Sequence, residues 1–373
     1  MRIGIDARMF GPGYGLGRYV EQLIKHLEKN DRENEYVVFM KNDTWDLWKP
    51  KYDNFKKVKA NIHWYTFAEQ LKLKSIIKKE QIDLMHFPHW NIPIFFNDPF
   101  VVTIHDLTMF HFARPEASTR SRLIFWLKDK VHRWVVGRVV KKALHIITTS
   151  DFTKQDVHRT LSVSLDRMTT VYQSPFQEDG WKKTDREIVK KHGITKDYIM
   201  YVGAAYPHKN LETLLKAWQI FEEKYGDNYE LVLAGKKNYF YEHLLKSDDF
   251  QKCNNITYID FPNDEDLASL YSWASLYVFP SLYEGYGLPP LEAISYDIPV
   301  VSSNESCLPE VLGDAALYFD PRNPEHMCNV MHSALINKDI QMSLTQNGRD
   351  RIKQLSSKKF ALETLELYKK YSK

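Results

Sequence analysis

The chain has 373 residues, which favours two domains of about 150–200 residues over a single core. Hydrophobic residues make up 43% and charged residues 27%, as in globular proteins, and a formal net charge of +3 argues against a nucleic-acid partner. The three cysteines, Cys253, Cys307 and Cys328, are too scattered for a disulfide framework or a metal pattern, which favours a reducing compartment.

The first residues have a strand pattern rather than that of a signal peptide, and no run approaches the roughly 20 apolar residues that span a bilayer. We therefore expect a cytoplasmic protein, attached at most to the inner face of the cell membrane.

Short apolar runs alternate with segments of helical periodicity along the chain. Most runs are continuous, which is typical of strands buried on both faces of a parallel sheet. The strands expected in the first half are Ile3–Ala7, Tyr36–Met40, Ile62–Tyr65, Leu84–Phe87, Phe100–Ile104, His145–Thr149 and Thr169–Tyr172. Those expected in the second half are Tyr198–Gly203, Glu230–Ala234, Ile256–Ile259, Leu276–Phe279, Pro299–Ser302 and Ala316–Phe319. The pattern predicts the α/β class, with two Rossmann-like, doubly wound parallel-sheet domains.

Proline, glycine and charged residues interrupt this pattern at Ser174–Lys183. We expect an N-terminal domain over residues 1–178, a C-terminal domain over residues 179–357 and an amphipathic helix over residues 358–373. Doubly wound sheets bind ligands at the carboxyl ends of their strands, so we expect a central cleft there.

The first loop, Gly11-Pro-Gly-Tyr-Gly-Leu-Gly-Arg-Tyr19, connects a strand to a helix. Glycines let a backbone approach an anion, and a helix start supplies N–H groups and a positive dipole end. The spacing differs from the dinucleotide pattern Gly-X-Gly-X-X-Gly. Phosphate contact and a tight turn both remain open.

Two histidine-containing segments follow expected strands in the first half. His105 and Asp106 lie just past a buried strand, which makes His105 an active-site candidate. The run His86–Trp90 has no metal-ligand spacing, so we assign it to packing or acceptor contact.

The segment Arg114–Lys142 contains nine lysines and arginines against Glu116 and Asp129. Leu123, Leu127, Val131 and Trp134–Val135 recur within it at helical spacing, and Phe125 and Trp126 lie nearby. Two interpretations are open: a surface for anionic lipid headgroups, or a core-packed helix with a solvated basic face.

In the second half, Tyr201–Leu211 again leads from a strand into a helix. Lys209 is expected in the first helical turn, where it opposes the helix dipole unless an anion binds there. His208 either donates to the same anion or points into solvent.

The segment Phe279–Ala293 contains a glycine turn followed by two prolines that can begin a helix. Glu292 is expected in the first turn, ionised and suited to a ribose diol. Glu284, eight positions earlier, can reach another part of the same ligand. The alternative is a capping glutamate and a surface glutamate.

These segments together resemble the retaining glycosyltransferases of family 4, which have the GT-B fold. The most specific match is the Glu-X7-Glu motif, Glu284 to Glu292, and the supporting matches lie in the family's order across almost the whole chain. The supporting matches are Gly15-Leu-Gly-Arg-Tyr19, Thr103-Ile-His-Asp-Leu107, Tyr201-Val-Gly203 and Pro207-His-Lys-Asn210. The resemblance also implies that the C-terminal helix returns to the N-terminal domain.

The resemblance implies metal-independent, retaining transfer of a hexose from GDP-mannose or a UDP-sugar, which is a co-substrate, without a cofactor. The acceptor would be a glycan or lipid-linked saccharide in polysaccharide or glycolipid assembly. The resemblance assigns Glu292 to the ribose hydroxyls, Glu284 to the donor sugar and Lys209 to the diphosphate. It also places His105 beside the transferred sugar. The catalytic residues would be His105, Glu284 and Lys209. The further donor-binding residues would be Gly15, Gly17, Arg18, Gly203, His208, Gly285, Tyr286, Gly287, Leu288 and Glu292.

One departure concerns the phosphate site. Many relatives have an arginine where this chain has His208 or Ala204, and Arg18 is a possible substitute. The alternatives are a non-catalytic nucleotide-sugar-binding subunit and a nucleotide-sugar epimerase, against which the Glu-X7-Glu motif argues. The base is expected near Lys236–Lys237 and Asp260–Pro262.

Overall fold

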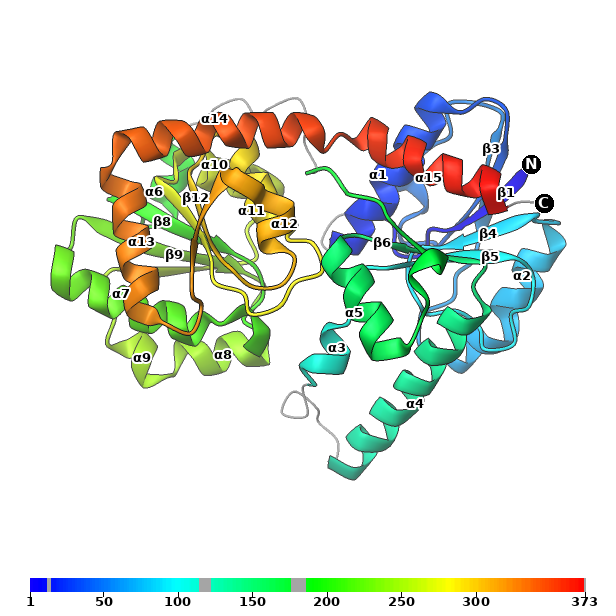
Figure 1. Cartoon of the computed structure of the whole chain (residues 1–373), viewed down its shortest axis with the longest axis horizontal. Helices are drawn as coiled ribbons and strands as arrows, with labels where there is room; N and C mark the ends of the chain where they lie inside the picture. The colour runs from blue at the N-terminus through cyan, green and yellow to red at the C-terminus, as the bar shows by residue number, and fades with distance from the viewer. Residues whose placement is uncertain (12–14, 114–121, 176–185, 372–373) are drawn as a thin grey trace. The chain divides into compact units, whose positions relative to one another are not determined.

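The computed structural model describes residues 1–11, 15–113, 122–175 and 186–371 (Figure 1). The chain forms two compact units. Unit 1 comprises Met1–His111, Ser118–Phe176 and Leu355–Lys373, and unit 2 comprises Phe112–Ala117 and Gln177–Gln354. The boundary expected between residues 178 and 179 falls outside the described residues.

Unit 1 contains a seven-stranded sheet in the order β3-β2-β1-β4-β5-β6-β7, and all neighbouring strands run parallel. Its strands are β1 (Arg2–Asp6), β2 (Glu35–Met40), β3 (Phe55–Lys59), β4 (Leu84–Phe87), β5 (Phe100–Ile104), β6 (His145–Thr148) and β7 (Met168–Thr170). Its helices and helical turns are α1 (Gly15–Asn30), η1 (Trp45–Leu47), η2 (Glu69–Leu73), α2 (Lys74–Lys79), α3 (Thr108–His111), α4 (Arg122–Lys142), α5 (Asp151–Leu161), η4 (Leu165–Arg167) and α15 (Ser357–Tyr371).

The two faces of this sheet bury separate clusters. One cluster joins β1 and β2 to α1 and α15, and the other joins β4 and β5 to α2, α4 and α5. A buried chain of hydrogen bonds fastens α15: the Tyr19 and Thr103 hydroxyls lie 2.9 Å apart, Thr103 Oγ1 lies 2.8 Å from His86 Nε2, and His86 Nδ1 lies 2.5 Å from the Tyr368 hydroxyl. Burial lowers the pKa of His86 to about 3, so this neutral imidazole serves packing.

Unit 2 contains a six-stranded parallel sheet in the order β10-β9-β8-β11-β12-β13. Its strands are β8 (Asp197–Val202), β9 (Tyr229–Gly235), β10 (Ile256–Asp260), β11 (Leu276–Phe279), β12 (Val300–Ser303) and β13 (Ala316–Phe319). Its helices and turns are α6 (Arg186–Lys191), η5 (Pro207–Lys209), α7 (Leu211–Tyr225), α8 (Tyr239–Leu245), α9 (Asp248–Gln251), α10 (Asp264–Trp273), α11 (Leu288–Ser295), α12 (Leu308–Leu312), η6 (Gly313–Ala315), α13 (Pro324–Ile336) and α14 (Lys338–Gln354).

One expected strand is wrong. Residues 62–65 form a loop, and the third strand in sequence is β3 instead. β3 pairs with β2 at the edge of the sheet, where its sequence Phe-Lys-Lys-Val-Lys places Lys56 and Lys59 in solvent.

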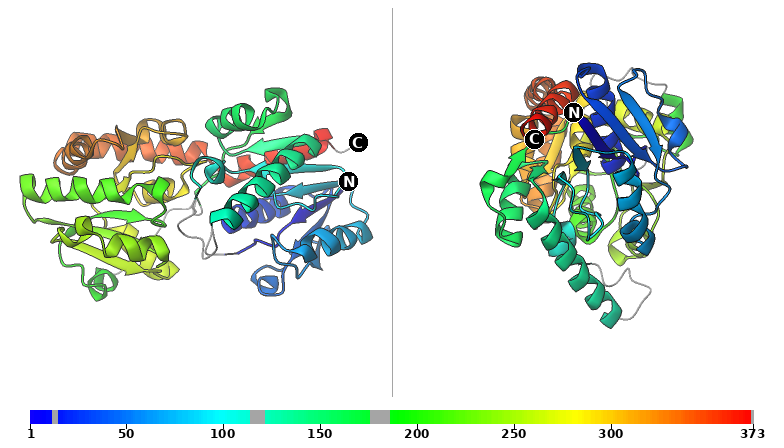
Figure 2. Two further views of the ribbon diagram at one scale, coloured as in Figure 1. Left: turned by 90° about the horizontal axis from the view of Figure 1, so that it is seen from below. Right: turned by 90° about the vertical axis from the view of Figure 1, so that its right-hand side faces the viewer.

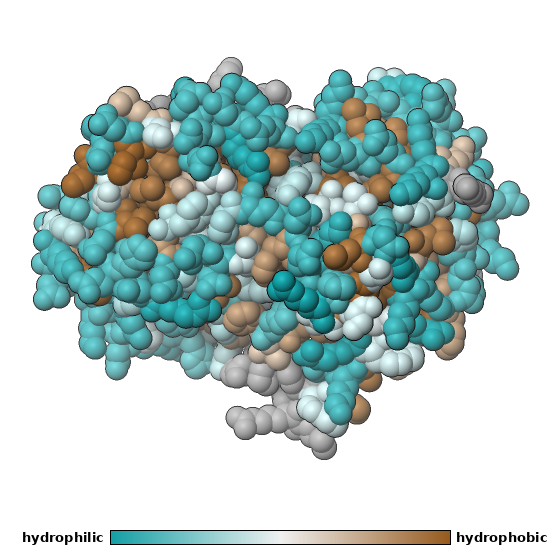
Figure 3. Space-filling model, viewed as in Figure 1, coloured by the Kyte–Doolittle hydropathy of each residue, from teal (hydrophilic) through white to brown (hydrophobic). Residues whose placement is uncertain are grey.

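The α/β class with two doubly wound parallel sheets is confirmed (Figures 1 and 2). The face shown in Figure 3 is mostly hydrophilic, with hydrophobic residues in smaller separate patches. Within the described ranges, no helix is both long and apolar enough to cross a membrane.

Candidate functional site

Each sheet reverses its strand order at one pair of neighbours, and doubly wound folds bind ligands at the carboxyl ends of that pair. The pair is β1 and β4 in unit 1, and β8 and β11 in unit 2. Lys209 follows β8 and Glu284 follows β11. The two charged candidates therefore lie on the two sides of the reversal point in unit 2.

Lys209 is the last residue of η5, which separates β8 from α7. The expectation that it lies in the first turn of α7 is wrong, because the helix begins two residues later. Asn210 is left-handed, with φ 62° and ψ 37°, and its amide donates to the carbonyl oxygens of Pro280 and Pro321 at 3.1 and 2.7 Å. These bonds hold Lys209 beside the loop that follows β11.

Lys209 and Glu284 form an ion pair. Lys209 Nζ donates to Glu284 Oε1 at 2.5 Å, and the two side chains are only 17% and 12% exposed. The ammonium lies 5.6 Å from the ring centroid of Phe279, the last residue of β11. Glu284 N–H donates to Ser306 Oγ at 3.1 Å, which anchors this loop. The structure thus brings together two of the three expected catalytic residues.

Glu292 is the fifth residue of α11, which begins at Leu288. The expectation that it lies in the first turn is wrong, because the two prolines are the second and third helical residues. Gly287 precedes the helix with φ 89°, a left-handed conformation that favours glycine. The Glu292 carboxylate is half-buried and accepts from the Tyr271 hydroxyl at 3.4 Å.

The other expected residues of unit 2 lie at the same edge of the sheet. Gly203 directly follows β8, and its carbonyl oxygen accepts from the Tyr241 hydroxyl at 2.9 Å. Gly285 and Tyr286 are buried in the loop after β11. His208 is also buried, so the alternative that it points into solvent is wrong.

The loops after β9 and β10 are tied together. Lys237 N–H donates to Asp260 Oδ1 at 2.8 Å, and Phe261 N–H donates to the Gly235 carbonyl at 3.1 Å. The Phe261 ring is exposed, and Lys236 Nζ lies 5.4 Å from its centroid. An exposed ring beside a cation offers a planar base a stacking surface.

In unit 1, Gly15 begins α1, and Gly17 and Arg18 lie in its first turn. A Cβ on Gly17 would lie 2.2 Å from the carbonyl oxygen of Gly11, so only glycine allows this close approach. The first turn of α1 contains no acidic residue, which favours an anion at its positive end. Residues 12–14 of the same loop lie outside the described residues.

His105 directly follows β5. Its Nε2 donates to the Pro88 carbonyl at 2.8 Å, and its ring contacts Tyr19 edge to face, with centroids 4.7 Å apart. A carbonyl only accepts, so the proton lies on Nε2 and the lone pair on Nδ1. Burial lowers the pKa of His105, which keeps the imidazole neutral at pH 7. A neutral imidazole suits a sugar hydroxyl better than it suits a phosphate.

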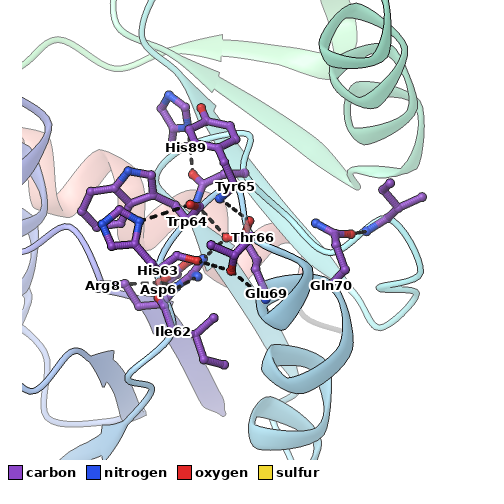
Figure 4. A network of polar contacts seen from close by, with 12 residues as sticks. Asp6, Arg8, Ile62, His63, Trp64, Tyr65, Thr66, Glu69, Gln70 and His89 are labelled. Atoms are coloured by element: carbon purple, nitrogen blue, oxygen red, sulfur yellow. Dashed lines mark hydrogen bonds and ion pairs between the residues drawn. The ribbon is translucent and has the colours of Figure 1, made fainter. Parts of the chain in front are cut away.

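A buried ionic cluster that was not expected from the sequence lies at the end of β1 (Figure 4). Arg8 is 1% exposed, and its guanidinium donates to both carboxylate oxygens of Asp6 at 2.8 and 2.7 Å and to Glu69 Oε1 at 2.8 Å. Burial alone would lower the pKa of Arg8, but the two carboxylates outweigh it and raise that pKa. Glu69 also accepts from Tyr65 N–H at 2.8 Å and from the Asn91 amide at 3.1 Å. The cluster therefore joins three loops of unit 1.

Arg8→Met should lower the free energy of unfolding by about 3–5 kcal/mol, because it leaves two buried carboxylates without their cation. Urea unfolding followed by circular dichroism measures this change. The matched control is Arg2→Met at the start of β1, whose guanidinium contacts Glu35 and Glu80 while partly exposed. The control should cost less than about 1 kcal/mol. Equal effects of the two changes would contradict the assignment.

Two family models match the chain. The model described as Glycosyltransferase Family 4 matches residues 14–173, and the model described as Glycosyl transferases group 1 matches residues 184–351. The chain is 28% identical to the O-antigen chain mannosyltransferase B of Escherichia coli, over 96% of each chain. It is 27% identical to the O-antigen chain mannosyltransferase RfbU of Salmonella typhimurium, over 69% of this chain and 66% of the relative.

The solved structure of Anabaena Alr3699/HepE in complex with UDP-glucose matches 99% of this chain and 100% of its own, with a TM-score of 0.72 and 14% sequence identity. Together with the two parallel-sheet units, this likeness defines the class as the GT-B fold. The family models and the relatives then identify the chain as a glycosyltransferase of the family 4 type.

Proposed function

We propose that the chain transfers a hexose from GDP-mannose or a UDP-sugar to a glycan or lipid-linked saccharide during polysaccharide or glycolipid assembly. Two relatives are named O-antigen chain mannosyltransferases, and a solved structure of similar fold is a complex with UDP-glucose. The observation that carries the proposal is the ion pair of Lys209 and Glu284 at the reversal point of unit 2.

The chemistry follows from the charges. Breaking the bond between the anomeric carbon and the diphosphate oxygen develops positive charge on the sugar and negative charge on the diphosphate. A preorganised cation beside the departing diphosphate stabilises this state more than it stabilises the intact donor. Lys209 is the residue that supplies this charge. Glu284 holds its ammonium in place before the donor binds and then contacts a hydroxyl of the sugar.

The other residues complete the donor contacts. Glu292 would accept hydrogen bonds from the ribose hydroxyls, and the base would stack near Phe261 and Lys236. His105 would position a sugar hydroxyl. Ala204 carries no charge, so we propose that Arg18 and the N–H groups at the start of α1 supply the second anion contact.

We further propose that transfer retains the anomeric configuration and needs neither a metal ion nor a cofactor. The resemblance to family 4 supports retention. Lysine and N–H dipoles perform the charge stabilisation that a metal ion gives in other transferases. Nuclear magnetic resonance of the first product formed distinguishes retention from inversion.

A non-catalytic sugar-nucleotide-binding subunit is the second candidate, and the absence of an arginine at Ala204 and His208 favours it. A subunit of this kind would bind the donor without cleaving it. Slow hydrolysis of the donor in water therefore separates the two candidates.

We expect one sugar nucleotide among the GDP, UDP and ADP sugars to raise the melting temperature and to be hydrolysed slowly. A thermal-shift screen with a nucleotide-release assay measures both. Adding excess EDTA should change the release rate by less than about twofold, because a lysine replaces the metal ion. The absence of both stabilisation and release with every donor would refute the proposed function.

A further inference from the structure

We propose that unit 1 docks on an anionic lipid bilayer through one surface, which we call the docking surface, built from α4, the loop at residues 91–96 and η2. This inference rests on the proposed function, since it specifies where a lipid-linked acceptor would be met.

The outward face of α4 carries large apolar side chains that are not covered by the rest of unit 1. The second half of the helix packs into unit 1 through Val136, Val139 and Val140, whereas the end nearest Arg122 projects away from the sheet (Figures 1 and 2). Four large apolar side chains on the projecting part are 52–58% exposed. They are Trp126, Leu127, Val131 and Trp134. Contiguous exposed apolar residues on a soluble protein mark an interaction surface.

Basic residues lie between these apolar ones. Lys128, Lys130, Arg138 and Lys141 are all exposed on α4. Lys130 Nζ lies 4.0 Å from the ring centroid of Trp126, and the Arg138 guanidinium lies 5.9 Å from that of Trp134. The one acid between Trp126 and Lys142 is Asp129, which is paired with Arg133 at 2.7 Å. The surface therefore carries strong positive charge beside its tryptophans.

The docking surface continues onto two neighbouring elements. Arg138 Nε and Lys142 Nζ donate to the Ile94 carbonyl at 3.5 and 3.2 Å, which joins α4 to the loop at residues 91–96. Ile94 N–H donates to Gln70 Oε1 at 2.8 Å, which joins that loop to η2 (Figure 4). Phe95 and Leu71, next to these contacts, are 67% and 74% exposed. Exposed apolar residues thus extend over three elements that hydrogen bonds connect.

A lipid bilayer fits this composition better than other partners. A second copy of the chain would place like charges opposite one another, which opposes association through this face. Interfacial helices combine tryptophan and leucine with lysine and arginine in this way, so that apolar side chains enter the acyl boundary while cations contact headgroup phosphates. Trp126 and Trp134 are eight residues apart, about 12 Å along one side of α4, so both can enter one membrane plane.

The test is flotation of the full chain with vesicles of phosphatidylcholine alone and of phosphatidylcholine mixed with phosphatidylglycerol. We expect binding only to the mixed vesicles. At about 0.5 M salt, well above physiological ionic strength, that binding should be lost because the headgroup phosphates are screened. Trp126→Ala/Trp134→Ala and Lys128→Glu/Lys141→Glu should each lower the partition coefficient at least about tenfold. Phe95→Ala/Leu71→Ala should lower it severalfold, which tests the extension beyond α4.

The matched controls are Ile336→Ala/Met342→Ala, which removes two exposed apolar side chains of unit 2, and Lys338→Glu/Lys358→Glu, which reverses two exposed lysines elsewhere. Both should bind vesicles like the wild type. Equal binding by the docking-surface variants and the wild type overturns the inference. So does a dimer in light scattering that the tryptophan changes dissociate, because the occupant is then a second copy.

Donor hydrolysis measured on every variant separates this inference from the proposed function. Variants of the docking surface should hydrolyse the donor like the wild type, because none of these residues belongs to the donor contacts. Normal hydrolysis without vesicle binding refutes the docking surface alone. Vesicle binding without hydrolysis in the wild type refutes the proposed transferase activity alone.

Discussion

Lys209→Ala should lower kcat/KM for glycosyl transfer by about a hundredfold to a thousandfold, the usual cost of removing one preorganised group that stabilises transition-state charge. The lysine lies at the end of η5, held by Asn210 beside the loop that carries Glu284. Alanine leaves the diphosphate without this cation during bond cleavage. Nucleotide release under saturating acceptor measures the effect, and circular dichroism shows whether the variant remains folded.

Lys216→Ala is the matched control, since this exposed lysine of α7 has one distant partner, Asp249 at 3.9 Å. Its activity should stay within about twofold of the wild type, as for a surface ion pair.

Glu284→Gln tests the ion pair of Lys209 and Glu284 directly. If Glu284 acts partly by holding the ammonium, its effect and that of Lys209→Ala should be less than additive. A folded Lys209→Ala protein with wild-type turnover would remove the lysine from the mechanism.

Glu292→Ala should abolish the stabilisation that the preferred nucleotide gives to the wild-type protein. A ligand at about a hundred times its Kd stabilises the folded state by about 2.7 kcal/mol, which corresponds to roughly 5–10 °C in melting temperature for a domain of this size. Without the carboxylate, the ribose hydroxyls lose an ionised acceptor. The measurement is a thermal-shift titration with the nucleotide alone.

Glu223→Ala, on the exposed side of α7, is the control and should respond to nucleotide like the wild type. Glu292→Gln keeps the shape of the side chain and removes its charge, so its stabilisation should fall between those of Glu292→Ala and the wild type. A Glu292→Ala protein that shows the full shift would exclude this residue from nucleotide binding.

The sheets could be predicted because strands buried on both faces leave continuous apolar runs, as in β5 and β8. β3 could not, because three lysines at the sheet edge hide its pattern. The apolar residues of Ile62–Tyr65 resemble a strand, yet Tyr65 has φ 61° and donates its N–H to Glu69. This hydrogen bond joins residues only four positions apart, and the apolar run by itself does not indicate the turn that it accompanies.

Lys209 and Glu284 could be placed near one another from the sequence, because loops at the carboxyl ends of neighbouring parallel strands meet. Their direct ion pair could not be predicted, since it depends on the turn of η5. The contact between Arg8 and Glu69 could not be predicted for a similar reason. Asp6 and Arg8 are visible beside an apolar strand, but Glu69 lies 61 residues from Arg8.

The start of α11 was expected one residue too late. Proline is favoured at the first helical position, and this preference alone would begin the helix after Leu288. The left-handed Gly287 instead begins the helix at Leu288, which places Glu292 in the second turn. The role of Glu292 as a motif residue stays a prediction, while its place relative to the helix dipole required the backbone dihedrals.

The position of α15 has a consequence for the order in which the protein is made. Phe360, Leu365 and Tyr368 of α15 belong to the same core as β1 and α1, although more than 300 residues lie between these segments in the sequence. During translation, unit 2 is complete in sequence before unit 1 can finish its core. The N-terminal unit must therefore remain without its final helix while the C-terminal unit emerges, which reverses the usual vectorial order of domain folding.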